Sequence, residues 1–426
     1  MMKIKLLLAA AIVSLAPAVQ AETLMDVYKH LHANPELSSM ETETAAYLAK
    51  RMKKLGFDVT ENFGGTGVVS VMKNGPGKTI MIRADMDGLP VKENTGLPFA
   101  SKVVKKDRFG DEWPVMHACG HDIHMTTFLG TARELIANKD LWSGTLVMIL
   151  QPAEEISHGA KDMLKAGLFT KFPRPDFNLA LHANSAMPAG KVGVTSGYAL
   201  ANVDSVDITV KGIGGHGAYP QTTKDPIVLA SQIVLALQTI VSREVAAQDS
   251  AVVTVGSIHG GTKHNIIGEE VKLQLTVRSY SDETRDKLLA SIERIAENMG
   301  RVAGLPDEKL PTVEIKDEYT PAAFNNPDLA TKAMHTMAKV IGEKNVLVAE
   351  PVMGGEDFGR YGRTEDKIPG MIYWLGAANP EEVKAARKAG RSMPSLHSPF
   401  FKPDAAAAIP VGVDTMTATA VSLFNE

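Results

Sequence analysis

The spacing of apolar residues along the first half of the chain alternates between two periods. Segments with an apolar residue every three to four positions are predicted to form amphipathic helices, and short apolar runs between Gly, Asn and Pro turns are predicted to form strands. The predicted helices are 24–33, 41–54, 121–137 and 159–166, and the predicted strands are 67–72, 78–84, 144–151 and 177–182. Strands that alternate with helices indicate an α/β fold with a mostly parallel sheet.

From about Asn202 the order of elements changes to strand, helix, strand, strand, helix, strand, which is the ferredoxin-like order. These segments are 203–210, 226–241, 251–258, 270–279, 282–299 and 312–319. After Pro321 the first pattern resumes. We therefore predict one α/β domain formed by 22–200 and 322–426, with an inserted ferredoxin-like α+β domain at 201–321.

The N-terminus has the pattern of a secretory signal peptide, residues 1–21. Lys3 and Lys5 accompany an apolar run from 4 to 16, and a small-residue cleavage pattern ends at Ala21. The run is too short for a stable membrane span, and no second long apolar run is evident, so we expect no membrane association after cleavage. We predict a periplasmic or secreted protein.

The net charge and the cysteine content of the chain limit which classes of function are plausible. The 426-residue chain has a formal net charge of −4 and no basic stripe, which argues against nucleic-acid binding. Its single cysteine, Cys119, cannot form an internal disulfide, although an exported protein meets an oxidising compartment. Metal ligation would explain a free thiol in such a protein.

The stretch from Met116 to Thr126 concentrates groups that bind metals. It holds Cys119 and three of the chain's twelve histidines, which are His117, His121 and His124. A thiolate and several imidazoles within a short segment are typical ligands of a borderline-soft divalent metal. The alternative is a loop with a buried thiol and solvated histidines.

Polar clusters follow three of the predicted strands, where the chemistry of parallel sheets gathers. They are Asp85-Met86-Asp87, Gln151-Pro152-Ala153-Glu154-Glu155 and Leu181-His182-Ala183-Asn184. Taken singly, a Glu-Glu pair usually lies on a solvent-exposed face, and a histidine at a strand end usually has a structural role and is not a metal ligand. Together they favour a metal site.

The Gly212–Gly217 stretch matches the dinucleotide pattern G-x-G-x-x-G, but Pro220 prevents the helix that this pattern requires, so we interpret it as a glycine-rich loop that displays His216.

Eight motifs in order along the chain resemble the co-catalytic metallo-aminoacylase and carboxypeptidase family. The similarity is greatest to its amidohydrolase branch of hippurate hydrolases and auxin-conjugate or N-acyl-amino-acid amidohydrolases. The motifs are Ile82-Arg-Ala-Asp-Met-Asp-Gly-Leu-Pro, His117-Ala-Cys-Gly-His-Asp, Gln151-Pro-Ala-Glu-Glu, Leu181-His-Ala-Asn, Gly214-Gly-His-Gly-Ala-Tyr-Pro, His264-Asn-Ile-Ile, Gly354-Gly-Glu-Asp-Phe and Leu396-His-Ser-Pro-Phe.

This resemblance implies a site for two divalent metal ions, zinc, manganese or cobalt, in the larger domain. The implied ligands are Cys119, His121, Glu155, His182 and His397. Cys119 is implied to bridge the ions, and Glu154 matches the general base. Many relatives carry His-x-Asp where this chain has Asp85-Met86-Asp87, so Asp85 and Asp87 are expected to orient ligands or, alternatively, to be turn carboxylates. The roles of Glu356 and Asp357 are left open.

The resemblance makes the insert a lid and dimerisation domain of a homodimer or higher homo-oligomer. His216 is implied to stabilise the oxyanion, often in the partner subunit's site, and Asn265 to lie beside the substrate. Arg278 is a candidate to bind the substrate carboxylate, or else a surface arginine.

The function that these features predict is an exported metal-dependent amidohydrolase that cleaves N-acyl, hippurate-like amino acids. A metallo-dipeptidase or carboxypeptidase is the close alternative. More distant alternatives are a cysteine hydrolase with Cys119 as the nucleophile and a non-catalytic solute-binding protein. The acyl group, the preferred amino acid and the metal are not determined by the sequence.

Overall fold

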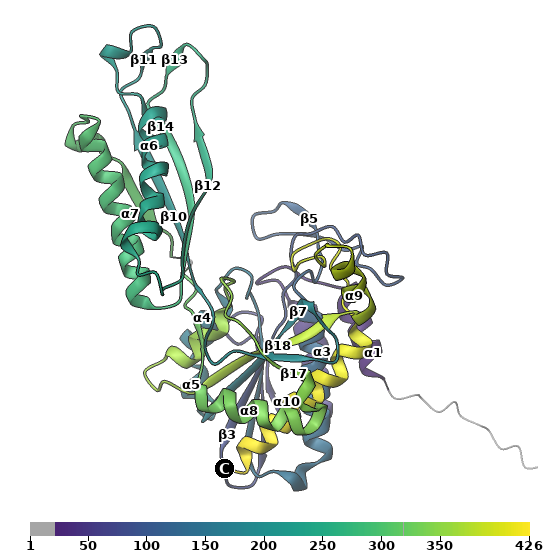
Figure 1. Cartoon of the computed structure of the whole chain (residues 1–426). Coiled ribbons are helices and arrows are strands. Elements are labelled where there is room, and N and C mark those ends of the chain that lie inside the picture. The colour runs from purple at the N-terminus through teal and green to yellow at the C-terminus, as the bar shows by residue number, and fades with distance from the viewer. Residues whose placement is uncertain (1–21, 318) are drawn as a thin grey trace, which may run out of the picture.

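The protein is described by a computed structural model that covers residues 22–317 and 319–426. The predicted signal peptide, residues 1–21, lies outside the described residues. The chain forms a large domain around one sheet and a long insert that projects from it (Figure 1).

The large domain contains an eight-stranded sheet in the order β1-β2-β6-β3-β7-β18-β8-β17. The strands are β1 (Asp58–Thr60), β2 (Val68–Asn74), β3 (Thr79–Asp85), β6 (Gly144–Gln151), β7 (Phe177–Pro188), β8 (Val192–Val194), β17 (Val346–Val348) and β18 (Gly370–Ala378). The four central strands β6, β3, β7 and β18 are parallel, and antiparallel pairs flank them at β1–β2–β6 and β18–β8. The predicted α/β fold with a mostly parallel sheet is therefore confirmed.

Helices cover one face of this sheet, and a second, smaller core covers the other. The helices of the first core are α1 (Leu24–Ala33), α2 (Thr42–Lys54), α3 (His121–Ala137), α8 (Pro327–Ile341) and α10 (Ala405–Phe424). The second core contains α4 (Gly159–Lys165), α5 (Leu168–Lys171) and the 3₁₀ segment Asp357–Arg363. Along β6, Leu146 and Met148 face the first core and Val147 and Ile149 the second. The strand is apolar on both sides because both faces are covered.

The insert is an antiparallel sheet in the order β12-β14-β10-β15 with two helices on one face. Its elements are β10 (Asn202–Lys211), α6 (Pro226–Thr239), β12 (Ala251–Gly260), β14 (Glu270–Ser279), α7 (Asp282–Val302) and β15 (Thr312–Ile315). This succession of elements is the ferredoxin-like one predicted from the sequence. A short pair, β11 (Gly215–His216) with β13 (Ile266–Ile267), forms the end of the insert that is farthest from the large domain (Figure 1).

Several elements differ from the prediction. Strand β7 continues to Pro188, so His182 lies within the strand rather than at its end. The hairpin of β4 (Val104–Lys106) and β5 (Glu112–Pro114) was not predicted, since three-residue strands leave almost no periodic signal. The remaining helix and strands are α9 (Pro380–Lys388), β9 (Gly197–Leu200) and β16 (Ala323–Asn325).

Two helical segments are long and apolar enough to span a membrane, contrary to the expectation that no further long apolar run is present. They are Pro226–Glu244 and Ala405–Phe424, each with a mean hydropathy of 1.4. Helix α10 packs against α3 and α8 within the first core, and α6 packs on the sheet of the insert. Packing accounts for much of the apolar character of α10, whereas α6 keeps exposed apolar side chains such as Val228 and Leu235.

Candidate metal centre

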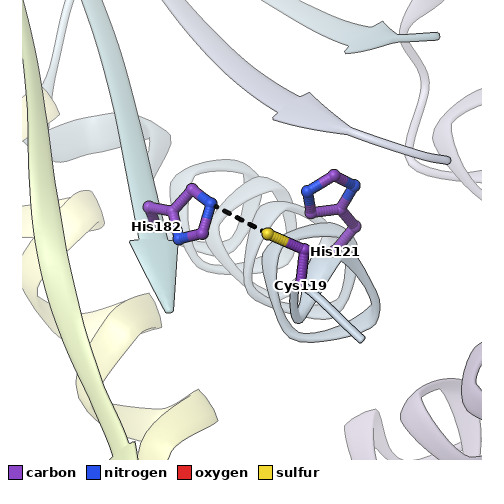
Figure 2. Close-up of side chains that lie close together, drawn as sticks. All are labelled: Cys119, His121 and His182. Atoms are coloured by element: carbon purple, nitrogen blue, oxygen red, sulfur yellow. Dashed lines mark hydrogen bonds between the residues drawn. The ribbon is translucent and has the colours of Figure 1, made fainter. Parts of the chain in front are cut away.

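Cys119 and His121 lie at the start of α3, and His182 approaches them from β7 (Figure 2). The Cys119 sulfur points toward the His182 ring, with Sγ 3.5 Å from Nε2. Gly120 makes this turn with φ of 88°, and a Cβ there would lie 2.8 Å from the Ala183 side chain. Only glycine therefore lets α3 begin this close to β7.

Two residues distant in the sequence complete the group. His397 Nε2 lies 3.2 Å from Cys119 Sγ and 3.5 Å from Glu155 Oε2. Glu155 Oε1 in turn lies 3.9 Å from His121 Nε2. The backbone of His397 is left-handed, with φ of 65°, and its N–H donates to the Ala118 carbonyl at 2.9 Å. All five predicted ligands thus lie in one group.

The spacing of these atoms fits metal coordination. Ligand atoms about 2.0–2.3 Å from a tetrahedral ion lie about 3.3–3.7 Å from one another. Cys119 belongs to two candidate groups, one with His121 and His182 and one with Glu155 and His397. Sharing of the sulfur agrees with the predicted bridging role. Buried His121 Nε2 and Glu155 Oε1 have no hydrogen-bond partner among the described residues, as expected of atoms reserved for a cation.

Hydrogen bonds at the other ring nitrogen orient the histidines. His121 Nδ1 donates to the Asp87 carbonyl at 2.8 Å, and His182 Nδ1 donates to the Ala183 carbonyl at 2.8 Å. Each Nε2 is therefore left with its lone pair directed at the site, the tautomer that a metal ligand needs.

The two other histidines of the cysteine-containing stretch are not placed as ligands. His124 Nδ1 donates to Asp85 Oδ1 at 2.6 Å, and its Nε2 accepts from the Ala183 N–H at 2.7 Å, so both nitrogens are occupied. His117 is fully buried without a hydrogen-bond partner among the described residues, and burial lowers its pKa to about 4. Asp85 thus acts on the site through His124.

The turn after β6 gives Glu154 and Glu155 different sets of neighbours beside a shared one, His121. Ala153 has a left-handed φ of 53°, and its N–H donates to Glu41 Oε1 at 2.8 Å. The Glu155 N–H donates to Asp87 Oδ2 at 3.0 Å. Glu41 and Asp87, both buried, therefore hold a strained turn in which Glu155 meets Cys119 and His397, while Glu154 Oε2 lies 4.0 Å from His121 Nε2.

Glu154 faces a second acidic cluster with Glu356 and Asp357. Burial and then the nearby Glu356 raise the pKa of Glu154 well above its ordinary value. Arg83 binds this cluster, with Nη2 2.8 Å from Glu356 Oε1 and 3.1 Å from Asp357 Oδ1, and Nη1 2.5 Å from Asp85 Oδ2.

Sequence reasoning assigned no role to Glu41, Arg83, Glu356 or Asp357. A signal for Arg83 was present, because a charged residue interrupts the apolar strand β3 and must be paired if it is buried. Glu41 had no such signal, since it lies at the start of a helix where carboxylates are common.

Negative charge dominates the site. Burial lowers the pKa of His121, but Asp85 and Asp87 outweigh burial and raise this pKa to about 10. Burial, followed by Glu155 and Glu154, raises the pKa of the Cys119 thiol well above its ordinary value. A cysteine nucleophile requires the opposite shift, whereas cations would offset this charge.

The predicted residues of the insert are not brought to this group within the chain. His216 and Asn265 lie together at the outer end of the insert, where the Gly217 N–H donates to the Asn265 carbonyl at 2.9 Å (Figure 1). Both are exposed. Arg278 lies at the inner end of β14, half-buried, with Nη1 3.4 Å from the Met353 carbonyl oxygen.

Comparisons with known proteins agree with this geometry. The profile of peptidase family M20/M25/M40 matches residues 81–421. The chain is 37% identical over 363 residues to thermostable carboxypeptidase 2 of Saccharolobus solfataricus, covering 84% of this chain and 87% of the relative. It is 39% identical over 335 residues to hippurate hydrolase of Campylobacter jejuni, covering 77% and 82%. The solved Bacillus subtilis YXEP protein, a dinuclear metal-binding peptidase, matches with a TM-score of 0.76 and 30% identity, covering 94% of this chain and 97% of that one.

We predict that the purified protein carries up to two divalent ions per chain and that their removal lowers its melting temperature, because bound ions stabilise only the folded state. Glu155→Gln should lower the metal content, whereas the matched variant Glu154→Gln should retain it. Elemental analysis and thermal melts with and without chelator test this. Equal metal content in the two variants would contradict the assignment of their roles.

Proposed function

Because the chain belongs to peptidase family M20/M25/M40, and is therefore a metal-dependent hydrolase of amide bonds, we propose that it is an exported amidohydrolase of N-acyl amino acids. The observation that supports this most is the group around Cys119, in which five side chains with ligand spacing adjoin a free carboxylate, Glu154. Similarity to a hippurate hydrolase favours an acyl amino acid as the substrate.

In this proposal Cys119, His121, Glu155, His182 and His397 hold two divalent cations. When bound, such a pair acidifies a water molecule and polarises the substrate carbonyl. Glu154 takes a proton from the attacking water and later delivers it to the leaving amine nitrogen. Its raised pKa makes the protonated form accessible for the second transfer. The backbone bond from Ala153 to Glu41 holds the turn that carries this carboxylate, whose Oε2 lies 4.0 Å from Nε2 of the proposed ligand His121.

A metallo-carboxypeptidase is the second candidate, because the similarity to a thermostable carboxypeptidase is as extensive as that to the hippurate hydrolase. The cysteine-hydrolase alternative is disfavoured by the raised thiol pKa of Cys119. The two metal-dependent candidates differ in the group on the acyl side of the amide. In the amidohydrolase this group is a simple acyl group, and in the carboxypeptidase it is an amino-acyl residue of a peptide.

We predict that the metal-loaded enzyme hydrolyses N-acyl amino acids faster than dipeptides or longer peptides. A chromatographic screen of both substrate classes with zinc, manganese and cobalt tests this. Glu154→Gln should lower kcat on the best substrate by about 10²–10⁴-fold, since it removes the proton carrier. Preferential cleavage of peptides would instead favour the carboxypeptidase candidate.

We also propose that the active site is shared between two subunits. His216 Nδ1 accepts from the Ala218 N–H at 3.0 Å, which leaves Nε2–H as a donor exposed to solvent. A donor stabilises the reaction only where negative charge develops, on the carbonyl oxygen. His216 lies at the far end of its own insert (Figure 1). The simplest way to place a His216 side chain at the metal centre is therefore to supply it from a second chain.

The surface of the insert offers a way to pair. Strand β12 is an edge strand, with β14 as its neighbour on one side. Ile258 on this edge and Leu235 on α6 are 51% and 72% exposed. Unpaired backbone groups beside exposed apolar side chains favour edge-to-edge association with a second copy.

We predict that His216→Ala lowers kcat by about 10²-fold or more while metal content is retained. Mixing this variant with Glu154→Gln should restore activity, because a heterodimer would contain one site with both defects and one site with neither. Activity of the mixture, with subunit exchange verified by differently tagged chains, is the measurement. A mixture that exchanges but stays inactive would show that His216 does not act across subunits.

Export is proposed from the signal pattern of residues 1–21, and the described fold is compatible with cleavage after Ala21. Thr23 caps α1 in a capping box with Asp26, and Glu22 binds Arg51, so the residues that follow Ala21 have their own contacts with the large domain. We predict that protein recovered from the periplasm or medium begins at Glu22. Mass spectrometry of the intact protein measures this, and a functional enzyme found only in the cytoplasm with Met1 retained would contradict it.

A further inference from the structure

The β4–β5 hairpin exposes aromatic side chains beside the metal centre. Phe109 and Trp113 are 77% and 42% exposed. Adjacent exposed aromatic side chains on one hairpin are costly in water and commonly mark a binding site. The hairpin is also short, so these side chains are not needed to build a core of its own.

The conformation of this hairpin is well defined. Asp107 Oδ1 accepts from the N–H groups of Phe109 and Asp111 at 2.8 and 3.0 Å, and its Oδ2 accepts from Trp113 Nε1 at 3.1 Å. Gly110 completes the turn with a left-handed φ of 96°. One carboxylate therefore fixes the positions of both aromatic residues before any ligand arrives, which lowers the entropic cost of binding.

Phe109 and Trp113 line an open cavity of about 390 Å³ whose wall also includes Glu155 of the candidate metal centre. Its other apolar lining residues are Leu37, Leu89, Pro90 and Ile156. This volume lies in the range of small-molecule sites. Since Glu155 is one of the five candidate ligands, a group in the cavity would be part of a molecule whose scissile amide lies at the metals.

Two polar side chains of the cavity wall, Ser38 and Asp107, already have hydrogen-bond partners. Ser38 Oγ donates to Asp87 Oδ2 at 2.6 Å, and Asp107 accepts the three bonds described above. The Arg108 guanidinium lies over the Phe109 ring, 4.9 Å from its centroid. The wall therefore offers mainly apolar area, and selects its ligand by size and apolarity rather than by hydrogen bonds.

The position of the hairpin indicates which half of the substrate binds in the cavity. Arg278, the candidate for the substrate carboxylate, lies at the base of the insert near Met353 and Gly355. The hairpin rises from the same edge of the sheet at a separate place from the insert (Figure 1). With the amino-acid carboxylate held toward the insert, the acyl half of the amide extends toward the hairpin.

We propose that this cavity is an acyl-group pocket that makes the enzyme selective for N-acyl amino acids with a large apolar, preferably aromatic, acyl group, and that Phe109 and Trp113 are its specificity-determining residues. This inference rests on the proposed amidohydrolase function. Phe109 closes over the ring of the acyl group, and Trp113 forms the side of the pocket. A small acyl group would leave both aromatic side chains in water and gain little from them.

The test compares kcat/KM for N-benzoyl-glycine, N-hexanoyl-glycine and N-acetyl-glycine in wild type and Phe109→Ala. The variant should lose about tenfold in its preference for benzoyl over acetyl, with acetyl-glycine hydrolysis within about twofold of wild type. Phe109→Leu should retain part of the preference. Leu141→Ala, which truncates an apolar side chain that is 52% exposed and does not line the cavity, is the matched control and should change neither value.

A second series varies the amino-acid half, with N-acetyl-glycine and N-acetyl-phenylalanine. Phe109→Ala should leave their ratio unchanged, and a change confined to this series would overturn the assignment to the acyl side. An equal loss on every substrate, or no loss, would overturn the pocket while the amidohydrolase function stands. If wild type cleaves none of these compounds, the proposed function fails and the pocket assignment fails with it.

Discussion

Two consecutive buried carboxylates, Glu154 and Glu155, are held in one turn beside His121, and much of the large domain is arranged around that turn. The left-handed backbone at Ala153, held by Glu41, and the amide of Glu155, held by Asp87, fix the turn that carries both side chains. The energy stored in such a turn is offset by buried hydrogen bonds that only the folded protein can supply.

The same contacts link the turn that carries the two carboxylates to the ligands on α3. Asp87 accepts from the Glu155 amide with its side chain and from His121 with its backbone carbonyl. Asp85 orients His124 and pairs with Arg83, which in turn binds the Glu356 carboxylate behind Glu154. One end of β3 therefore positions residues from three other segments of the chain. The excess of negative charge that results is what a pair of divalent cations would balance.

The large domain and the insert differ in where they place their candidate functional residues. The large domain buries its ligand group among strands and α3, whereas the insert displays His216 and Asn265 on an exposed outer end. Burial holds the candidate metal ligands in fixed positions. The exposed end of the insert is placed where its side chains could contact another chain, as proposed for His216. The β4–β5 hairpin adds a third element, a mainly apolar wall that includes Phe109 and Trp113 and shares a cavity with Glu155.

Local pattern in the sequence determined the kind of each major element, since the alternation of β10 and the helical spacing of α7 reflect one buried face each. It also determined the family, because motifs such as His117-Ala-Cys-Gly-His-Asp are contiguous, and the family match over 81–421 confirms that resemblance. Spacing alone did not reveal that His124 is excluded as a ligand by its bonds to Asp85 and Ala183. Nor did it show the part played by Glu41, or the pocket under Phe109. Those features depend on contacts between segments far apart in the chain, and such contacts exist only once the packing of β3, β6 and α3 has fixed which atoms meet.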